Sequence, residues 1–144
     1  MFFVKTQINF EAAHRLYNVN TFSKECRENI HGHSYKVTIV VGRDKLNSSN
    51  MVVDFKLLKK VVKEKIEKPF DHSCVLNIDD PLVESVTNSC KKVIVTQNNP
   101  TAEWMAKEFF TKIRVSLLSL DSQLVVTEVR VQETENNIAI YKED

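Results

Sequence analysis

Glycine is scarce in this chain of 144 residues, which contains only two, at positions 32 and 42. A Gly-rich phosphate loop or a dinucleotide-binding turn needs two or three closely spaced glycines, so neither motif is present. The chain also has only three cysteines, at irregular spacing. An odd cysteine count argues against a disulfide framework and predicts a reducing, cytoplasmic location.

Excess charge of one sign and long apolar runs are also missing. The chain has 20 Lys and Arg against 19 Asp and Glu, without the basic bias of a nucleic-acid binder. No apolar segment approaches the ~18 residues of a membrane span, and the first residues, MFFVKTQ, lack the form of a signal peptide. We therefore expect neither nucleic acid nor membrane as a partner, and a single domain over residues 1–144.

Alternating apolar residues predict two strands in the first third of the chain. Residues 2–14 place apolar side chains at even positions, and residues 31–41 place them at odd positions. This period of two is typical of half-buried strands. The segment 15–30 between them is polar and aperiodic, so we expect a loop there.

Two helices are predicted next. The first begins after Asp54, a favoured N-cap, and is bounded by Pro69; the second begins near Pro100, where proline suits the first turn. Each carries an apolar stripe at helical spacing. The stripes are Phe55, Leu58, Val62 and Ile66, then Ala102, Met105, Phe109, Ile113 and Leu117. Residues 70–99 are expected to form loops with room for one short strand at 92–95.

The C-terminal segment alternates again. Val125, Val129, Val131 and Glu133 share one parity, and the pair Asn136-Asn137 then precedes residues 138–141 in a predicted hairpin. The order strand, strand, helix, helix, strand, strand predicts an α+β fold. We expect a four-stranded antiparallel sheet with two helices on one face.

Three histidines fall at strand ends on the predicted buried faces: His14, His31 and His33. Burying an imidazole without a hydrogen-bond partner is costly. Three neutral imidazoles with an open fourth position are typical of catalytic Zn²⁺. The alternative is a set of core histidines bonded to carbonyls, and spacing alone leaves open whether His14 approaches the other two.

Candidate proton-transfer groups lie just before the histidine strand. Cys26 becomes a reactive thiolate if a cation or base lies nearby, and Glu28 is placed to act as a general base. The alternatives are an ordinary loop cysteine and a solvated carboxylate. Cys74 and Cys90 have no such setting, and we interpret them as structural.

Two further acidic positions are candidates. In Asp71-His72 a carboxylate is placed to orient an imidazole, although adjacent residues need not bond each other. Glu133 continues the inward parity of its strand, where a ligand with a cyclic N–C–NH₂ edge would offer it two donors. The alternative for Glu133 is a frayed strand end.

Five motifs occur in order along nearly the whole chain. They are Phe10-Glu-Ala-Ala-His14-Arg-Leu16, Cys26…His31-Gly-His33, Phe70-Asp71-His72…Leu76-Asn77, Pro100-Thr101-Ala102-Glu103 and Glu133-Thr134. Together they resemble the 6-pyruvoyltetrahydropterin synthase / 6-carboxytetrahydropterin synthase family. The resemblance implies a tunnelling (T-fold) domain assembled as a homo-hexamer, a dimer of trimers with active sites between subunits. It also implies 7,8-dihydroneopterin triphosphate as the substrate.

The resemblance also assigns roles by position. It implies one Zn²⁺ per subunit, held by His14, His31 and His33. It implies that Cys26 is the proton-transferring thiol, activated by Asp71 and His72.

For the substrate, the resemblance implies that Glu133 anchors the pterin ring, with Thr101 and Glu103 in the same pocket. Basic residues near the zinc ligands would hold the triphosphate, and the candidates are Arg15, Lys24 and Arg27. Whether Mg²⁺ assists is left open.

One segment departs from the two main branches of this family. It reads Cys-x-Glu-x-x-His-Gly-His, so Glu28 also fits the Glu-x-x-His-Gly-His pattern of a branch associated with folate synthesis. In that branch glutamate stands in for cysteine, and the product is 6-hydroxymethyl-7,8-dihydropterin. We expect hydroxymethyl formation together with some pyruvoyl product. The alternatives are the 6-carboxytetrahydropterin synthase of queuosine biosynthesis and a non-catalytic, zinc-stabilised oligomerisation module.

Overall fold

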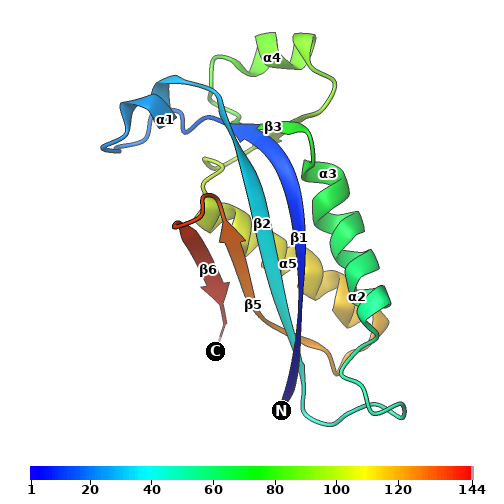
Figure 1. Ribbon diagram of the computed structural model, residues 1–144. Coiled ribbons are helices and arrows are strands. Elements are labelled where there is room, and N and C mark those ends of the chain that lie inside the picture. Colours follow the sequence, from blue (N-terminus) through cyan, green and yellow to red (C-terminus); the bar gives the residue numbers. More distant parts are fainter. Residues whose placement is uncertain (144) are drawn as a thin grey trace.

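One long antiparallel strand pair forms the centre of the molecule. β1 (Phe2–His14) and β2 (His31–Arg43) pair along their whole length, from Phe2 opposite Arg43 to His14 opposite His31. In the computed structural model, which describes residues 1–143, this pair curves across the molecule in front of the helices (Figure 1). The alternation predicted both strands correctly, because β1 and the first part of β2 bury one face and expose the other. The last part of β2, which includes Thr38 and Arg43, is buried on both faces.

The sheet has six strands rather than the four that we expected, and it is mixed. β5 (Val125–Gln132) and β6 (Ile138–Lys142) extend it antiparallel beside β2, as predicted. On the other side, β3 (Ser73–Asn77) and β4 (Val93–Thr96) add parallel to β1. The sequence hid β3 because nearly all of it is buried, which removes the alternation that marks a half-buried strand. The α+β class and the T-fold are consistent with this sheet.

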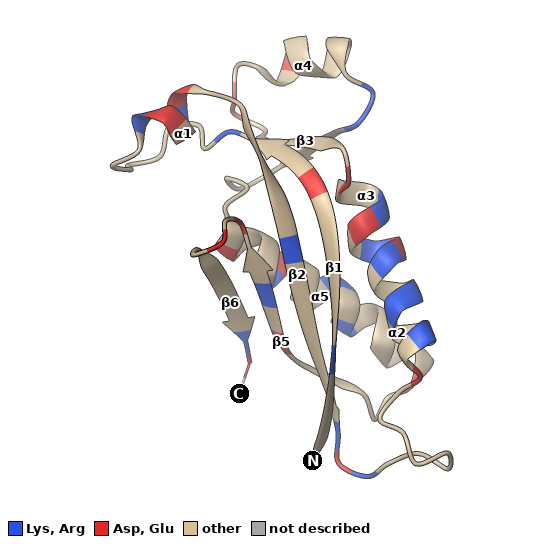
Figure 2. Ribbon diagram, in the orientation of Figure 1, with Lys and Arg blue, Asp and Glu red and all other residues tan. Residues whose placement is uncertain are grey.

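A long helical stretch and a second helix cover one face of the sheet (Figure 1). The stretch consists of α2 (Phe55–Val62), a π-helical turn η1 (Lys63–Glu67) and α3 (Lys68–Phe70). The second helix is α5 (Ala102–Leu120). None of the helices in residues 1–143 has the length and apolar character that a membrane crossing requires. Figure 2 shows the basic residues of α2 and α3 on the side turned away from the sheet.

A polar side chain caps each of these helices: Asp54 caps the first, as expected, and Thr101, for which we expected no capping role, caps the second. The Asp54 carboxylate accepts from the amides of Lys56 and Leu57, and the Thr101 hydroxyl accepts from the Trp104 amide. Pro69 does not bound the first helix, which continues to Phe70. In addition, short helices α1 (Lys24–Glu28) and α4 (Val83–Ser89) occupy segments that we expected to be loops.

An aromatic cluster lies between the sheet and the helices. The rings of Phe10 and Tyr35 stack with centroids 5.0 Å apart, and Phe70 and Phe109 meet edge to face at 4.9 Å. All four side chains are buried. Because Phe10 and Tyr35 lie a few residues from the histidines on the same face, this core supports the end of the sheet that carries them.

A bulge in β5 changes which of its residues face the core. The register against β2 shifts between Val40 and Val41, which makes Thr127 an extra residue. Val125 is therefore 46% exposed and its predicted inward orientation is wrong, while Val129 and Val131 are fully buried. Glu133 keeps the parity of these two valines because it follows the bulge.

Arg43 joins distant segments at the far end of β2. The side chain is buried, and its guanidinium donates to the Asp121 carboxylate at 2.6 Å, the Gln123 side-chain oxygen at 2.8 Å and the Lys45 carbonyl at 2.9 Å. These contacts tie the strand end to the turn between α5 and β5.

We expect Arg43→Met to lower the free energy of unfolding by about 2 kcal/mol, because it removes charge-assisted hydrogen bonds from a buried site. Arg114→Met is the matched control, since Arg114 forms an exposed ion pair with Glu143 and its loss should cost less than about 1 kcal/mol. Urea unfolding at equal protein concentration measures both. Equal losses would contradict this role for Arg43.

Candidate active site

The three histidines meet at one end of the central strand pair. His14 ends β1, His31 faces it at the start of β2, and His33 follows on the same side. Their ring centroids are 4.6 to 5.1 Å apart, and one ligand nitrogen from each lies within 4.8 Å of the other two. The sequence spacing left open whether His14 approaches His31 and His33, and the tertiary structure brings the three together.

Backbone carbonyls orient two of these rings. His14 Nδ1 lies 2.7 Å from the Pro100 carbonyl oxygen, and His31 Nδ1 lies 3.1 Å from that of Asn29. A carbonyl only accepts, so Nδ1 carries the proton in each neutral ring and the Nε2 lone pair is free to bind a metal. Metal-binding histidines are typically oriented in this way. The carbonyl of Pro100 is a contact that sequence reasoning missed.

The Nε2 atoms converge without satisfying one another. Those of His14 and His31 are 3.0 Å apart, and His33 Nε2 is buried without a hydrogen-bond partner among residues 1–143. Unpaired buried polar atoms are costly, and a shared cation would satisfy all three. The residues present therefore fit a metal ion.

Burial disfavours the charged form of two of these imidazoles and lowers the pKa of both His14 and His33. It is the main cause that lowers the pKa of His14 to about 4; the bond to the Pro100 carbonyl opposes the shift, and His31 and His33 add to it. Burial also lowers the pKa of His33, against the attraction of the Glu133 carboxylate. Neutral imidazole is the form that binds a metal.

Glu133 lies at the edge of this cluster. Its Oε1 is 3.5 Å from His14 Nε2 and 3.6 Å from His33 Nε2, and its side chain is 24% exposed. The carboxylate thus lies between the histidines and solvent, on the side that its parity predicted.

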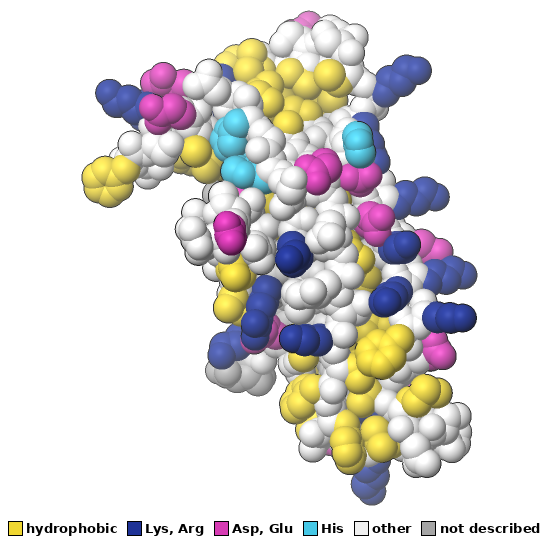
Figure 3. Space-filling view, in the orientation of Figure 1, with side chains coloured by type: hydrophobic (Ala, Val, Ile, Leu, Met, Phe, Trp, Pro, Cys, Tyr) yellow, Lys and Arg dark blue, Asp and Glu magenta, His cyan; other side chains and the backbone are white. Residues whose placement is uncertain are grey.

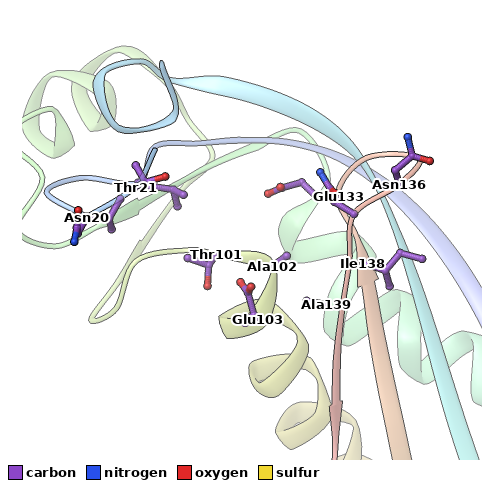
Figure 4. Close-up of a pocket in the computed structure, with 12 residues that line it drawn as sticks. Asn20, Thr21, Thr101, Ala102, Glu103, Glu133, Asn136, Ile138 and Ala139 are labelled. Atoms are coloured by element: carbon purple, nitrogen blue, oxygen red, sulfur yellow. The ribbon is translucent and has the colours of Figure 1, made fainter. Parts of the chain in front are cut away.

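A cavity of about 620 Å³ opens beside Glu133. Thr101 and Glu103, at the start of α5, form another wall (Figure 4), and the segment 16–21 after β1 completes it with the start of β6. The cavity has the size of a small-molecule site. The structure therefore brings together the three residues that we expected around a substrate ring.

The two candidate groups before the histidine strand lie on α1. Ser23 caps this helix, and its hydroxyl donates to Cys26 Sγ at 3.2 Å. The Cys26 carbonyl accepts from the Leu16 amide at 3.1 Å, which ties α1 to the chain just after His14. Cys26 is half-buried, whereas the Glu28 side chain is 61% exposed and lies 3.5 Å from Arg27. Residues two apart on a helix point in different directions, so the two groups diverge.

Asp71 and His72 bond each other, with Asp71 Oδ2 2.9 Å from His72 Nδ1. Asp71 Oδ1 accepts from the Glu11 amide at 2.9 Å, and this bond is the largest cause that holds the pKa of Asp71 below its usual range. Glu11 points to the face of β1 opposite the three histidines. Figure 3 shows imidazoles in two separate places on one face of the molecule, over the upper ends of β1 and β2 and near α3. Within the described protomer, this pair is not joined to Cys26.

Of the basic residues near the metal site, Arg15 is already paired. Its guanidinium donates twice to the fully buried Asp80 carboxylate, with Nε at 2.7 Å from Oδ2. Lys24 and Arg27 lie on α1.

A family model described as 6-pyruvoyl tetrahydropterin synthase matches residues 3–144. This chain belongs to that family. The chain is 33% identical over 160 residues to 6-carboxy-5,6,7,8-tetrahydropterin synthase of Aquifex aeolicus, covering 98% of each. It is 32% identical over 147 residues to human 6-pyruvoyl tetrahydrobiopterin synthase, covering 96% of this chain and 90% of that one. The structure of Caenorhabditis elegans 6-pyruvoyl tetrahydropterin synthase superimposes with a TM-score of 0.70 and 28% identity, covering 99% of this chain and 96% of that one.

Membership of the 6-pyruvoyl tetrahydropterin synthase family makes this chain a tetrahydropterin synthase, an enzyme with a pterin substrate. The expectation of an enzyme is thereby confirmed, against the alternative of a non-catalytic oligomerisation module.

We expect His33→Asn to weaken metal binding by more than about 100-fold, since loss of a direct ligand costs at least as much as loss of its hydrogen-bond partner. His72→Asn is the control, because His72 lies outside the cluster. Dialysis against Zn²⁺ or Co²⁺ followed by elemental analysis measures both. Unchanged affinity in His33→Asn would rule out this ligand set.

Proposed function

We propose that this synthase is a zinc-dependent lyase acting on 7,8-dihydroneopterin triphosphate. It forms 6-hydroxymethyl-7,8-dihydropterin together with some 6-pyruvoyltetrahydropterin, the latter by loss of triphosphate. The observation that supports this best is the convergence of three Nε2 atoms beside the cavity that contains Glu133. Imidazole nitrogens suit Zn²⁺, and three protein ligands leave a position open. Zinc held by His14, His31 and His33 would act as a Lewis acid that acidifies the side-chain hydroxyls of the substrate.

Glu133 binds the pterin ring in this proposal. An ionised carboxylate accepts two parallel hydrogen bonds from a cyclic N–C–NH₂ edge. Thr101 and Glu103 close the same cavity, although the Thr101 hydroxyl is also engaged as the cap of α5. This anchoring directs the substrate side chain toward the histidines, because Glu133 Oε1 lies within 3.6 Å of two of their nitrogens.

Cys26 and Glu28 divide the proton transfers between them. Cys26 is half-buried, and its sulfur accepts a hydrogen bond from the Ser23 hydroxyl. In this proposal Cys26 moves protons along the substrate side chain toward the pyruvoyl product. Glu28 points away from the same helix and acts as the base that leads to the hydroxymethyl product. Because the two groups diverge, each controls its own product.

The complete site contains more than one subunit in this proposal, and the chain forms a homo-hexamer as a dimer of trimers. Asp71 and His72 bond each other beside the backbone of Glu11, and neither contacts Cys26 among residues 1–143, so in this proposal a neighbouring subunit supplies the pair to Cys26. β6 is an edge strand, and its side chains Ile138 and Ile140 are 51% and 55% exposed. An exposed apolar edge strand of this kind is suited to pairing with a neighbouring subunit. Lys24 and Arg27 are then the candidates to hold the triphosphate.

One relative favours a second candidate function. The Aquifex aeolicus protein named 6-carboxy-5,6,7,8-tetrahydropterin synthase matches 98% of this chain at 33% identity. Formation of a 6-carboxy product releases acetaldehyde, which neither pyruvoyl nor hydroxymethyl formation by this proposal requires. Acetaldehyde in the reaction mixture therefore separates the two functions.

We expect Glu28→Ala to reduce 6-hydroxymethyl-7,8-dihydropterin formation by about 100-fold, the usual contribution of a general base, and to spare the pyruvoyl product. Cys26→Ala should do the reverse. Chromatography of products from dihydroneopterin triphosphate measures both, and Glu25→Ala controls for loss of an exposed carboxylate on α1. The proposal fails if the unaltered enzyme forms no hydroxymethyl product, or if Glu28→Ala leaves it unchanged.

Shared sites predict complementation between inactive variants. Cys26→Ala and His72→Asn subunits should each form little pyruvoyl product alone. After dissociation and reassembly of a 1:1 mixture, about a quarter of the sites combine both intact groups in a symmetric assembly, so about a quarter of the activity should return. No recovery in confirmed mixed oligomers would place both groups in one subunit.

A further inference from the structure

Lys92, just before β4, makes contacts on both sides of His72. Its Nζ donates to the carbonyl oxygens of Lys68 at 2.6 Å and Asp71 at 2.5 Å. Its backbone carbonyl accepts from the Cys74 amide at 3.0 Å. Lys92 thus bonds the backbone at three places: the end of the long helical stretch, the carbonyl of Asp71 and the start of β3.

The site of these contacts explains why a cation is favoured there. The last carbonyls of a helix lack intrahelical partners and carry partial negative charge. The stretch from α2 to α3 ends at Phe70, whose carbonyl accepts from the Ser73 hydroxyl at 2.6 Å. Lys92 satisfies two neighbouring carbonyls where the chain turns from the helix into the sheet.

The turn itself needs such support. His72 has a φ of 59°, in the left-handed region that non-glycine residues seldom adopt. Such a conformation persists only when surrounding contacts determine it. The Glu11 carbonyl accepts from the His72 amide at 2.6 Å, and Lys92 fixes the carbonyl of the preceding residue. In this conformation the His72 side chain is 80% exposed, and its Nδ1 bonds the Asp71 carboxylate.

We propose that Lys92 is a positioning residue for His72. By holding the carbonyls of Lys68 and Asp71 it keeps the Asp71 carboxylate on His72 Nδ1, so that the imidazole presents Nε2 outward in a fixed direction. The inference rests on the proposed function, in which His72 takes part in proton transfer. A residue that only capped the helix would affect stability without affecting the imidazole.

The test compares Lys92→Met with Lys91→Met, which removes the same charge from the adjacent exposed position. We expect Lys92→Met to lower kcat for the pyruvoyl product about tenfold, with KM and metal content unchanged, because misorientation affects the chemical step. Lys92→Arg should restore kcat to within about threefold, since a guanidinium also donates to two carbonyls. Unchanged kcat in Lys92→Met would overturn the proposal.

A second measurement does not depend on turnover. Diethyl pyrocarbonate acylates exposed imidazoles, and peptide mass spectrometry follows the rate at His72. We expect Lys92→Met and Asp71→Asn to slow this reaction several-fold and Lys91→Met to leave it unchanged. Equal rates in Lys92→Met and the unaltered enzyme would overturn the proposal. If the unaltered enzyme converts no pterin, the proposed function fails, and the acylation rates still decide the role of Lys92. Should Lys92→Met not fold, Lys92→Gln, which keeps a donor without the charge, replaces it.

Discussion

The pairing of β1 with β2 is the constraint on which the rest of the site depends. Their register places His14 directly opposite His31, and the period of two keeps His33 on the same face. A slip of one residue would turn one strand over and send its histidines to the opposite face of the sheet. The register is secured by apolar side chains on the same face, among which Phe10 and Tyr35 are almost fully buried. The packing of the core and the geometry of the metal ligands are therefore decided together.

Residues 100–103, at the start of α5, contact both the histidine cluster and the cavity at this end of the sheet. Thr101 caps the helix, the Pro100 carbonyl beside it fixes the tautomer of His14, and Glu103 lines the cavity. The first amides of a helix lack intrahelical partners, and the Thr101 hydroxyl satisfies that of Trp104, which helps to hold the chain here. This segment orients a histidine contributed by a strand 86 residues earlier.

Two groups of candidate catalytic residues lie beside β1. The histidine cluster lies beside Glu133 at the end of β1, and the Asp71–His72 turn bonds the backbone amide and carbonyl of Glu11 in the same strand. No contact joins these two groups among residues 1–143, and our proposal of a shared site rests on that separation. The strained backbone at His72 makes this turn depend on its neighbours, including Lys92.

The sequence by itself determined the half-buried strands, both capped helices, and the shared face of His31 and His33, because these are set by periodicity and by local hydrogen bonds. The meeting of His14 with that pair and of Glu133 with the cavity followed only as an expectation from parity and family motifs. Other features were decided by the tertiary structure alone. β3 and β4 join the sheet through non-local pairing, although a short strand at 92–95 was expected and β4 confirms it. The bulge at Thr127 reverses the orientation of Val125. The Pro100 carbonyl and the contacts of Lys92 also left no trace in the sequence pattern, because every residue has a carbonyl and only the folded chain decides which donor reaches it.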